Sequence, residues 1–307
     1  MKVLITGGAG FIGSHLAASW CAEGAQVVVL DSLRTGYLRN LEGLGVEFIN
    51  GRVEDREAVM AAAEGVDYVF HLAAIVNVPE SLEKPVETEQ INVLGTLNVL
   101  EAARRHRVRK VVYSSTCAVY GETERPMHRE TDLPEPISPY AVTKLAGEHY
   151  AAVYARAYGV ATAALRYFNV YGPGQDPTSP YAAVVAIFAE CARRGAPLRI
   201  YGDGMQTRDF IYVSDVVAAN RIAAEGGSGV YNVAGGSSLT VNDLAKAIIA
   251  VENSSSVIEH APERLGDVRH SRGDSSRLRA LGWQPQVSLA EGLRRTLRGV
   301  EPDAARP

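Results

Sequence analysis

Residues 3–13 read VLITGGAGFIG, an apolar run that leads directly into a turn with Gly7, Gly10 and Gly13 spaced three apart. Residues 14–23 then have the composition of a helix. A strand, a glycine turn and a helix in this order are the context of a dinucleotide-binding turn. Glycine lets the backbone approach a pyrophosphate closely, and the helix N-terminus offers it free N–H groups. The stretch therefore predicts a Rossmann-type fold.

A second apolar run ends in an acid that bears on the choice of dinucleotide. Residues 27–30 are followed by Asp31, 18 positions after Gly13. A carboxylate at this distance accepts a hydrogen bond from a ribose 2′-hydroxyl and repels a 2′-phosphate, which favours NAD over NADP. Arg34 keeps NADP open, because a nearby arginine can accommodate the phosphate.

The rest of the first half alternates between β-rich and helical stretches. We expect strands at residues 46–49, 68–72, 111–115 and 161–168, and helices at residues 56–64, 87–107 and 140–158. This alternation predicts an α/β fold with a doubly wound parallel sheet, which binds ligands at the carboxyl ends of its strands.

Past Asn169 the chain becomes richer in turns and predicts a smaller C-terminal α/β lobe that binds substrate. Its expected elements are helices near residues 181–194, 213–224 and 241–251 and a strand at residues 198–201. We therefore expect a dinucleotide-binding domain over residues 1–168 and a substrate lobe over residues 169–307 that exchanges segments with the first.

Composition excludes several classes of protein. The 307 residues are 47% hydrophobic with a net charge of −4, which suits a globular core and argues against a nucleic-acid partner. No apolar run approaches the length of a membrane span, and the chain enters a strand without a signal region. Three isolated cysteines, Cys21, Cys117 and Cys191, predict a reduced, cytoplasmic protein, and no histidine spacing predicts a metal site.

Tyr140 and Lys144 are candidates for acid–base chemistry. Residues four apart share one face of a helix, so the lysine charge lies beside the phenol. A nearby cation favours the phenolate and lowers the pKa of a tyrosine, and a cationic oxidised nicotinamide would lower it further. The pair predicts a proton shuttle for the oxidation of an alcohol.

The motifs together resemble a known family. The glycine turn, the stretch at residues 114–121, the Tyr140–Lys144 pair, LRYFNVYG at residues 165–172 and RDFIYV at residues 208–213 are similar to those of extended short-chain dehydrogenase/reductases. Within these enzymes the chain resembles the NAD-dependent epimerase/dehydratase family, and most of all the UDP-glucose (UDP-galactose) 4-epimerases. The likeness extends to about Pro285.

The resemblance implies roles for particular residues. Tyr140 would be the base, Lys144 would hold the nicotinamide ribose, and Thr116 would bond the sugar 4-oxygen. The other residues expected to contact NAD are Gly7, Gly10, Phe11, Ile12, Gly13, Asp31, Ser32, Thr35, Gly36, Leu72, Ala73, Ala74 and Asn92. The others expected to contact a UDP-sugar are Asn169, Tyr201, Arg208, Arg264, Asp267 and Ser271.

Departures from the family pattern narrow the expected chemistry. Cys117 and Ala118 stand where dehydratases carry Asp-Glu, and the glutamate of the related decarboxylases is missing. Arg52 stands where an aspartate commonly contacts adenine, and Val76 where some epimerases place a lysine. Ser271 matches a position that is a bulky tyrosine in epimerases limited to non-acetylated sugars, and a small residue there leaves room for a 2-acetamido group.

The resemblance implies 4-epimerisation of a UDP-hexose through a transient 4-keto sugar by a homodimer that associates through residues 87–107 and 140–158. Alternatives stay open at this point: a UDP-glucuronate 4-epimerase, a 4-keto-sugar reductase, or a non-catalytic dinucleotide-binding protein. The alanines of the second of these helices suit an intramolecular core as well as a dimer.

Overall fold

The computed structural model describes residues 1–123, 125–177, 183–263 and 268–299. Its largest element is a seven-stranded parallel sheet with the strand order β10-β6-β5-β4-β1-β2-β3. The strands are β1 (Lys2–Thr6), β2 (Gln26–Asp31), β3 (Glu47–Asn50), β4 (Tyr68–His71), β5 (Lys110–Thr116), β6 (Thr162–Tyr167) and β10 (Gly229–Val233). The six strands expected in the first half agree with those observed to within one residue at each end, and the predicted fold class is confirmed.

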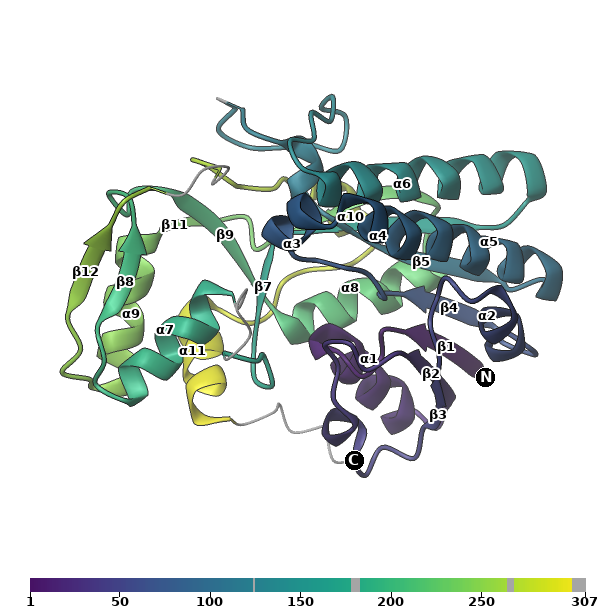
Figure 1. Ribbon diagram of the computed structural model, residues 1–307, viewed down its shortest axis with the longest axis horizontal. Helices are drawn as coiled ribbons and strands as arrows, with labels where there is room; N and C mark the ends of the chain where they lie inside the picture. Colours follow the sequence, from purple (N-terminus) through teal and green to yellow (C-terminus); the bar gives the residue numbers. More distant parts are fainter. Residues whose placement is uncertain (124, 178–182, 264–267, 300–307) are drawn as a thin grey trace.

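Helices cover both faces of this sheet, as expected for a doubly wound fold (Figure 1). One face carries α1 (Phe11–Ala22) and α8 (Val213–Glu225), which contact each other. The other face carries α2 (Arg56–Ala62), α5 (Gly95–His106) and α6 (Pro139–Tyr158), and α5 contacts both of the others. Successive side chains of a strand point to opposite faces, and Val3 and Ile5 accordingly join one buried cluster while Leu4 joins the other.

The helix expected over residues 87–107 is built from three consecutive segments. These are α4 (Pro85–Glu89), a π-helical turn η2 (Gln90–Leu94) and α5. The short helix α3 (Val78–Glu83) precedes them, and Figure 1 shows all of these segments lying along α6. A single π-helical turn inside a helix is often found at functional sites, and this one contains Asn92, one of the residues expected near NAD.

Helix α6, which carries Tyr140 and Lys144, has clear local signals at both ends. The hydroxyl of Ser138 accepts a hydrogen bond from Ala141 N at 3.2 Å, and Pro139 occupies the first helical position. Gly159 ends the helix with a φ of 71°, the left-handed conformation that glycine adopts without a steric penalty. Its start, directly before Tyr140, is therefore encoded locally.

The second lobe contains two small sheets. One has the order β11-β9-β7 and the other pairs β12 with β8. The strands are β7 (Asn169–Tyr171), β8 (Leu198–Tyr201), β9 (Thr207–Tyr212), β11 (Ser238–Thr240) and β12 (Ile258–Ala261), and the helices are α7 (Val184–Arg193), α9 (Val241–Glu252), α10 (Ser276–Arg279) and α11 (Leu289–Arg298). Only β8 of these strands was expected, because strands of three to six residues among turns give little alternating pattern.

The two lobes share a segment of chain. The expected boundary at residue 168 falls just after β6, but α8 and β10 return from the second half to pack on and extend the large sheet. Figure 1 shows α8 crossing beneath the sheet, between the small lobe and α1. Both halves of the chain therefore contribute to the large sheet and its covering helices. No helix among the described residues is long and apolar enough to span a membrane.

Candidate active site

A cleft of about 700 Å³ lies at the carboxyl ends of the large sheet. This volume is within the usual range for small-molecule sites. The residues that the sequence analysis assigns to NAD contact line it, with the exception of Asn92, and Thr116 lines it as well. They are Gly7, Gly10, Phe11, Ile12, Gly13, Asp31, Ser32, Thr35, Gly36, Leu72, Ala73, Ala74, Tyr140 and Lys144.

The turn after β1 is too tightly packed for a side chain at Gly7 or Gly13. A Cβ atom on Gly7, whose φ is +71°, would lie 2.7 Å from Ala73 N. A Cβ atom on Gly13 would lie 2.3 Å from the carbonyl oxygen of Gly7. Gly10 caps α1 without any side-chain hydrogen bond, and the first turn of the helix holds no acid. The positive end of α1 is thus left open to an anion, which fits the pyrophosphate of NAD.

Asp31 is held in one orientation at the end of β2. Its Oδ2 accepts a hydrogen bond from Ala9 N at 3.0 Å, and its Oδ1 accepts one from Leu33 N at 2.8 Å. A carboxylate has about four acceptor positions, so each oxygen can still accept a ribose hydroxyl. The backbone contacts therefore orient the acid without using up its capacity for a ligand.

Tyr140, Lys144 and Thr116 come together on the floor of the cleft. Lys144 Nζ donates a hydrogen bond to the carbonyl oxygen of Ser114 at 2.8 Å, which ties α6 to the end of β5. Thr116 ends β5, and its hydroxyl lies close enough to the Tyr140 phenol to oppose the rise in the pKa of that phenol. The same hydroxyl oxygen accepts from Ala118 N at 3.2 Å, which fixes its direction.

The charge state of this pair differs from the one expected from sequence. Burial raises the pKa of Tyr140 to about 12, although the neighbouring Thr116 hydroxyl lowers that pKa in part. Burial also lowers the pKa of Lys144 to about 7. The lowering of the Tyr140 pKa that was expected from Lys144 is therefore outweighed, because desolvation opposes both charges.

The loop after β4 is positioned by a buried hydrogen-bond chain around His71. The Thr96 hydroxyl donates to Asn92 O and lies 3.0 Å from His71 Nε2, so Nε2 carries the proton. His71 Nδ1 then accepts from the Thr6 hydroxyl at 2.7 Å, and the Thr6 oxygen accepts from Ala73 N. Burial, together with the charge of Lys144, lowers the pKa of His71 to about 3, so the ring stays neutral.

Asn92 lies behind this loop and does not line the cleft. Its Oδ1 accepts from Ile75 N at 2.8 Å, and its Nδ2 donates to Ile75 O at 2.9 Å and to Thr143 Oγ1 at 3.0 Å. The side chain thus satisfies both backbone groups of Ile75, a residue of the cleft wall, and links them to α6. Asn92 therefore reaches the cleft only through Ile75, whose backbone it holds in place.

A buried ion pair that the sequence did not predict joins α6 to β6. Arg166 on β6 donates to both carboxylate oxygens of Glu148 on α6, at 2.8 and 2.7 Å, and both side chains are 4% exposed. The hydroxyl of Ser115 donates to the same carboxylate. Glu148 follows Tyr140 and Lys144 by eight and four residues, so helical spacing was a signal that could have revealed it.

Most of the described residues that were predicted to bind the substrate do not line this cleft. Asn169 Nδ2 donates to Asp209 O at 3.2 Å, beside Arg208 on β9. Ser271 is bound to the same strand through Thr207 O, at 3.1 Å. Tyr201 ends β8 in the small lobe. Arg264 and Asp267 lie outside the described residues.

Arg208 and Ser271 nevertheless come close to Cys117, the residue after β5. The Ser271 hydroxyl lies 4.0 Å from Cys117 Sγ, and Cys117 directly follows Thr116. Burial raises the pKa of the Cys117 thiol to about 11, with Arg208 close enough to oppose the rise. A path of polar groups thus leads from Thr116 toward the small lobe. No group of three metal-ligating side chains occurs within the described ranges.

Comparison with known proteins is consistent with this geometry. The NAD dependent epimerase/dehydratase family matches residues 3–234. The chain belongs to this family. It is 41% identical to a UDP-glucose 4-epimerase from Mycolicibacterium smegmatis, with 97% of each chain covered.

Two solved structures are similar over almost the entire chain. A UDP-glucose 4-epimerase from Thermotoga maritima with UDP-glucose has a TM-score of 0.94 and 41% identity, covering 97% of this chain and 98% of that one. A UDP-glucose 4-epimerase from Thermus thermophilus in complex with NAD has a TM-score of 0.92 and 42% identity, covering 98% of this chain and 99% of that one.

The family also contains relatives with other activities. A UDP-N-acetylglucosamine 4-epimerase from Methanobrevibacter ruminantium is 38% identical over 97% of each chain, with a TM-score of 0.93. A dTDP-glucose 4,6-dehydratase from Streptomyces niveus is 33% identical over 97% of this chain and 92% of its own. The protein is therefore an NAD-dependent, nucleotide-sugar-modifying extended short-chain dehydrogenase/reductase.

Proposed function

We propose that the protein interconverts UDP-glucose and UDP-galactose by inverting C4 of the hexose. The observation that carries the proposal is the meeting of Tyr140, Thr116 and Lys144 in a cleft that also contains the glycine turn and Asp31. Cys117 and Ala118 follow Thr116 without the acid pair that a dehydratase needs to remove water. The chemistry supported is thus oxidation and reduction at one carbon.

In this proposal Tyr140 moves the proton and Thr116 positions the sugar oxygen. NAD, when bound, takes up hydride from C4 and later returns it. The Tyr140 phenolate oxygen accepts the proton of the 4-hydroxyl as the C4–H bond breaks, leaving a 4-keto sugar. After the sugar has turned its other face, Tyr140 returns that proton to the oxygen at C4. Burial raises the pKa of Tyr140 to about 12, so the phenolate form depends on positive charge beside the phenol, which an oxidised nicotinamide would supply.

A sugar that must turn needs firm anchors on its nucleotide and few on its hexose. We assign the anchoring role to Asn169 and Arg208, together with Arg264 and Asp267. Arginine suits the diphosphate because its planar guanidinium donates two parallel hydrogen bonds. The hydrogen bond of Asn169 to β9, the strand that carries Arg208, and the influence of Arg208 on Cys117 support this assignment.

The size of Ser271 extends the proposal to N-acetylated sugars. Its side chain lies 4.0 Å from Cys117, and a bulky residue at this position would fill space beside the catalytic strand. The proposal therefore includes UDP-N-acetylglucosamine and UDP-N-acetylgalactosamine as a second substrate pair.

The test offers UDP-galactose, UDP-N-acetylglucosamine and UDP-glucuronate separately to the purified protein without added coenzyme. We expect conversion of the first two to their 4-epimers, measured by chromatography of the products. Conversion of UDP-glucuronate alone would establish the uronic-acid epimerase instead, and activity only with added NADPH would establish a reductase.

Tyr140→Phe is the matched catalytic control. It removes the proton carrier and keeps the ring, so turnover should fall by roughly 10²–10⁴-fold while the protein still co-purifies with NAD. Full activity in this variant would remove Tyr140 from the mechanism.

We further propose that the protein acts as a homodimer. Several large apolar side chains are exposed on α6 and on the segments beside it: Val142, Tyr150, Val153, Tyr158, Leu82, Val86 and Leu94. The concentration of such side chains on neighbouring helices is typical of an interface between copies of a chain.

A further inference from the structure

The turn after Asp31 has an unusual backbone. Leu33 has a φ of 58°, a left-handed conformation that bulky residues rarely adopt. Its N–H donates to Asp31 Oδ1 at 2.8 Å, so the strained residue is held by the acid that faces the ribose. The next residue is Arg34, and the turn therefore determines where the Arg34 side chain starts.

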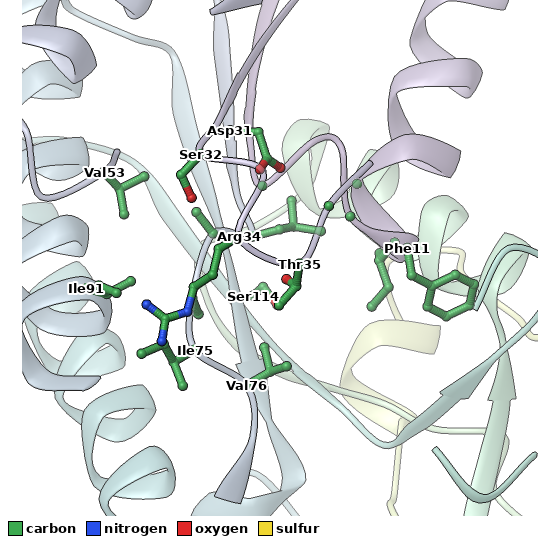
Figure 2. Close-up of a pocket in the computed structure, with 18 of the residues that line it drawn as sticks. Phe11, Asp31, Ser32, Arg34, Thr35, Val53, Ile75, Val76, Ile91 and Ser114 are labelled. Atoms are coloured by element: carbon green, nitrogen blue, oxygen red, sulfur yellow. The ribbon is translucent and has the colours of Figure 1, made fainter. Parts of the chain in front are cut away.

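The Arg34 guanidinium is directed to the opposite wall of the cleft. NH2 contacts Glu80 Oε1 on α3 at 2.6 Å, and NH1 contacts Glu87 Oε1 on α4 at 2.6 Å. Figure 2 shows the side chain extending away from Asp31, toward Ile75 and Ile91. Two ion pairs from two different helices thus hold the charge on the side of the cleft remote from the ribose-binding carboxylate.

The position of this charge matters because arginine is the usual partner of a 2′-phosphate. A guanidinium beside the ribose would bind that phosphate bidentately. With Glu80 and Glu87 present, Arg34 would have to give up two carboxylates to do so. The same two carboxylates would also repel the incoming phosphate.

We propose that Glu80 and Glu87 are specificity-determining residues for the dinucleotide. They sequester Arg34 so that a site containing an arginine next to Asp31 still selects NAD over NADP. The inference concerns the coenzyme and holds whichever sugar is converted. The proposal gives α3 and α4 a role in coenzyme choice. The sequence does not suggest this role, because both helices lie far from Asp31 along the chain.

Neighbouring charges do not replace this pairing. Lys84 lies 3.8 Å from Glu80 and is more exposed than Arg34, so it competes weakly. Arg52, which also lines the cleft, is paired with Glu54 at 2.5 Å. Arg52 is the alternative source of a phosphate contact, and the test must separate it from Arg34.

The test compares dinucleotide selection by full-length variants. Each purified protein is incubated with an equimolar mixture of NAD and NADP until the bound ratio is constant, then desalted, and the bound dinucleotides are quantified by reversed-phase chromatography. For Glu80→Gln combined with Glu87→Gln, we expect the bound NADP-to-NAD ratio to rise about tenfold or more, the scale of a charge-assisted hydrogen bond. Adding Arg34→Met to this double variant should return the ratio to the wild-type value.

Two further variants keep the proposal testable. Glu83→Gln changes an exposed acid on the same helix α3 and should leave the ratio unchanged. Glu87→Gln alone alters a side chain that is 35% exposed and should shift the ratio in the same direction by a smaller factor, even if the double variant folds poorly. An unchanged ratio in both Glu87 variants would overturn the proposal, and so would a gain that persists without Arg34, because Arg52 would then be responsible.

Discussion

Replacing Glu148 by glutamine tests whether the buried ion pair behind the active site supports catalysis. Glu148 lies one helical turn beyond Lys144, and its carboxylate binds both Arg166 and Ser115. Ser115 lies between the Lys144 acceptor Ser114 and the catalytic Thr116. The substitution keeps the shape of the side chain but leaves the Arg166 cation, 4% exposed, without its counter-charge.

The expected magnitude follows from the depth of the pair. Removing one partner of a buried ion pair costs about 3–5 kcal/mol, because the remaining charge stays desolvated. With an unfolding entropy of roughly 2.1 cal/mol/K per residue, a chain of 307 residues loses about 5–8 °C in melting temperature. We also expect kcat to fall by roughly tenfold or more at 25 °C, with a smaller change in KM, because the Tyr140 and Thr116 side chains are no longer held in the same relative position.

Thermal unfolding by circular dichroism and initial-rate kinetics measure the two effects. Glu291→Gln is the matched control, because Glu291 pairs with Arg294 and Arg295 at the surface, where it is 37% exposed, and should change stability by about 1 kcal/mol or less. Adding Arg166→Met to Glu148→Gln should restore part of the stability. A Glu148→Gln variant that melts within about 1 °C of wild type, or that keeps its full kcat, would refute the reasoning.

Three other predictions concern separate parts of the molecule. Gly13→Ala places a Cβ atom 2.3 Å from Gly7 O, so the NAD content of the purified protein should fall at least several-fold, and full retention would count against the pyrophosphate assignment. Asp209→Asn removes a carboxyl whose pKa burial raises from 3.8 to about 7. The folded wild type holds this proton where the unfolded chain releases it, so its stability declines as pH rises from about 4 to 7. Urea titrations should show no such contribution in the variant, and equal pH slopes would contradict the prediction. Val153→Asp puts a charge on the exposed apolar face of α6, so light scattering should report the monomer mass, whereas an unchanged mass would locate the dimer contact elsewhere.

Local patterns were sufficient for much of the fold. The run of residues 3–13 predicts β1, its turn and α1, because glycine spacing and strand–helix order act within a dozen residues. Helical spacing alone places Tyr140 and Lys144 on one face of α6, and Ser138 with Pro139 marks where that helix begins. The small strands of the second lobe gave no such pattern, since each is too short for alternation to stand out.

The contacts that tune the site connect distant positions. Arg34 meets Glu80 and Glu87 across 46 and 53 residues, and Arg166 meets Glu148 across 18. Nothing within either segment specifies its partner, because packing of helices and strands brings them together. Helical spacing can place Glu148 on the face of α6 that carries Tyr140 and Lys144, but it does not indicate that Arg166 is its partner.

The sequence by itself determined the fold class, the dinucleotide turn and the spacing of the proton-transferring pair, all of which depend on short-range geometry. The tertiary structure alone decided that Tyr140 has a raised pKa, that Lys144 has a lowered one, and that Arg34 extends away from Asp31. The physical reason is that desolvation and ion pairing depend on what surrounds a side chain in three dimensions, and those surroundings come from segments far apart along the chain.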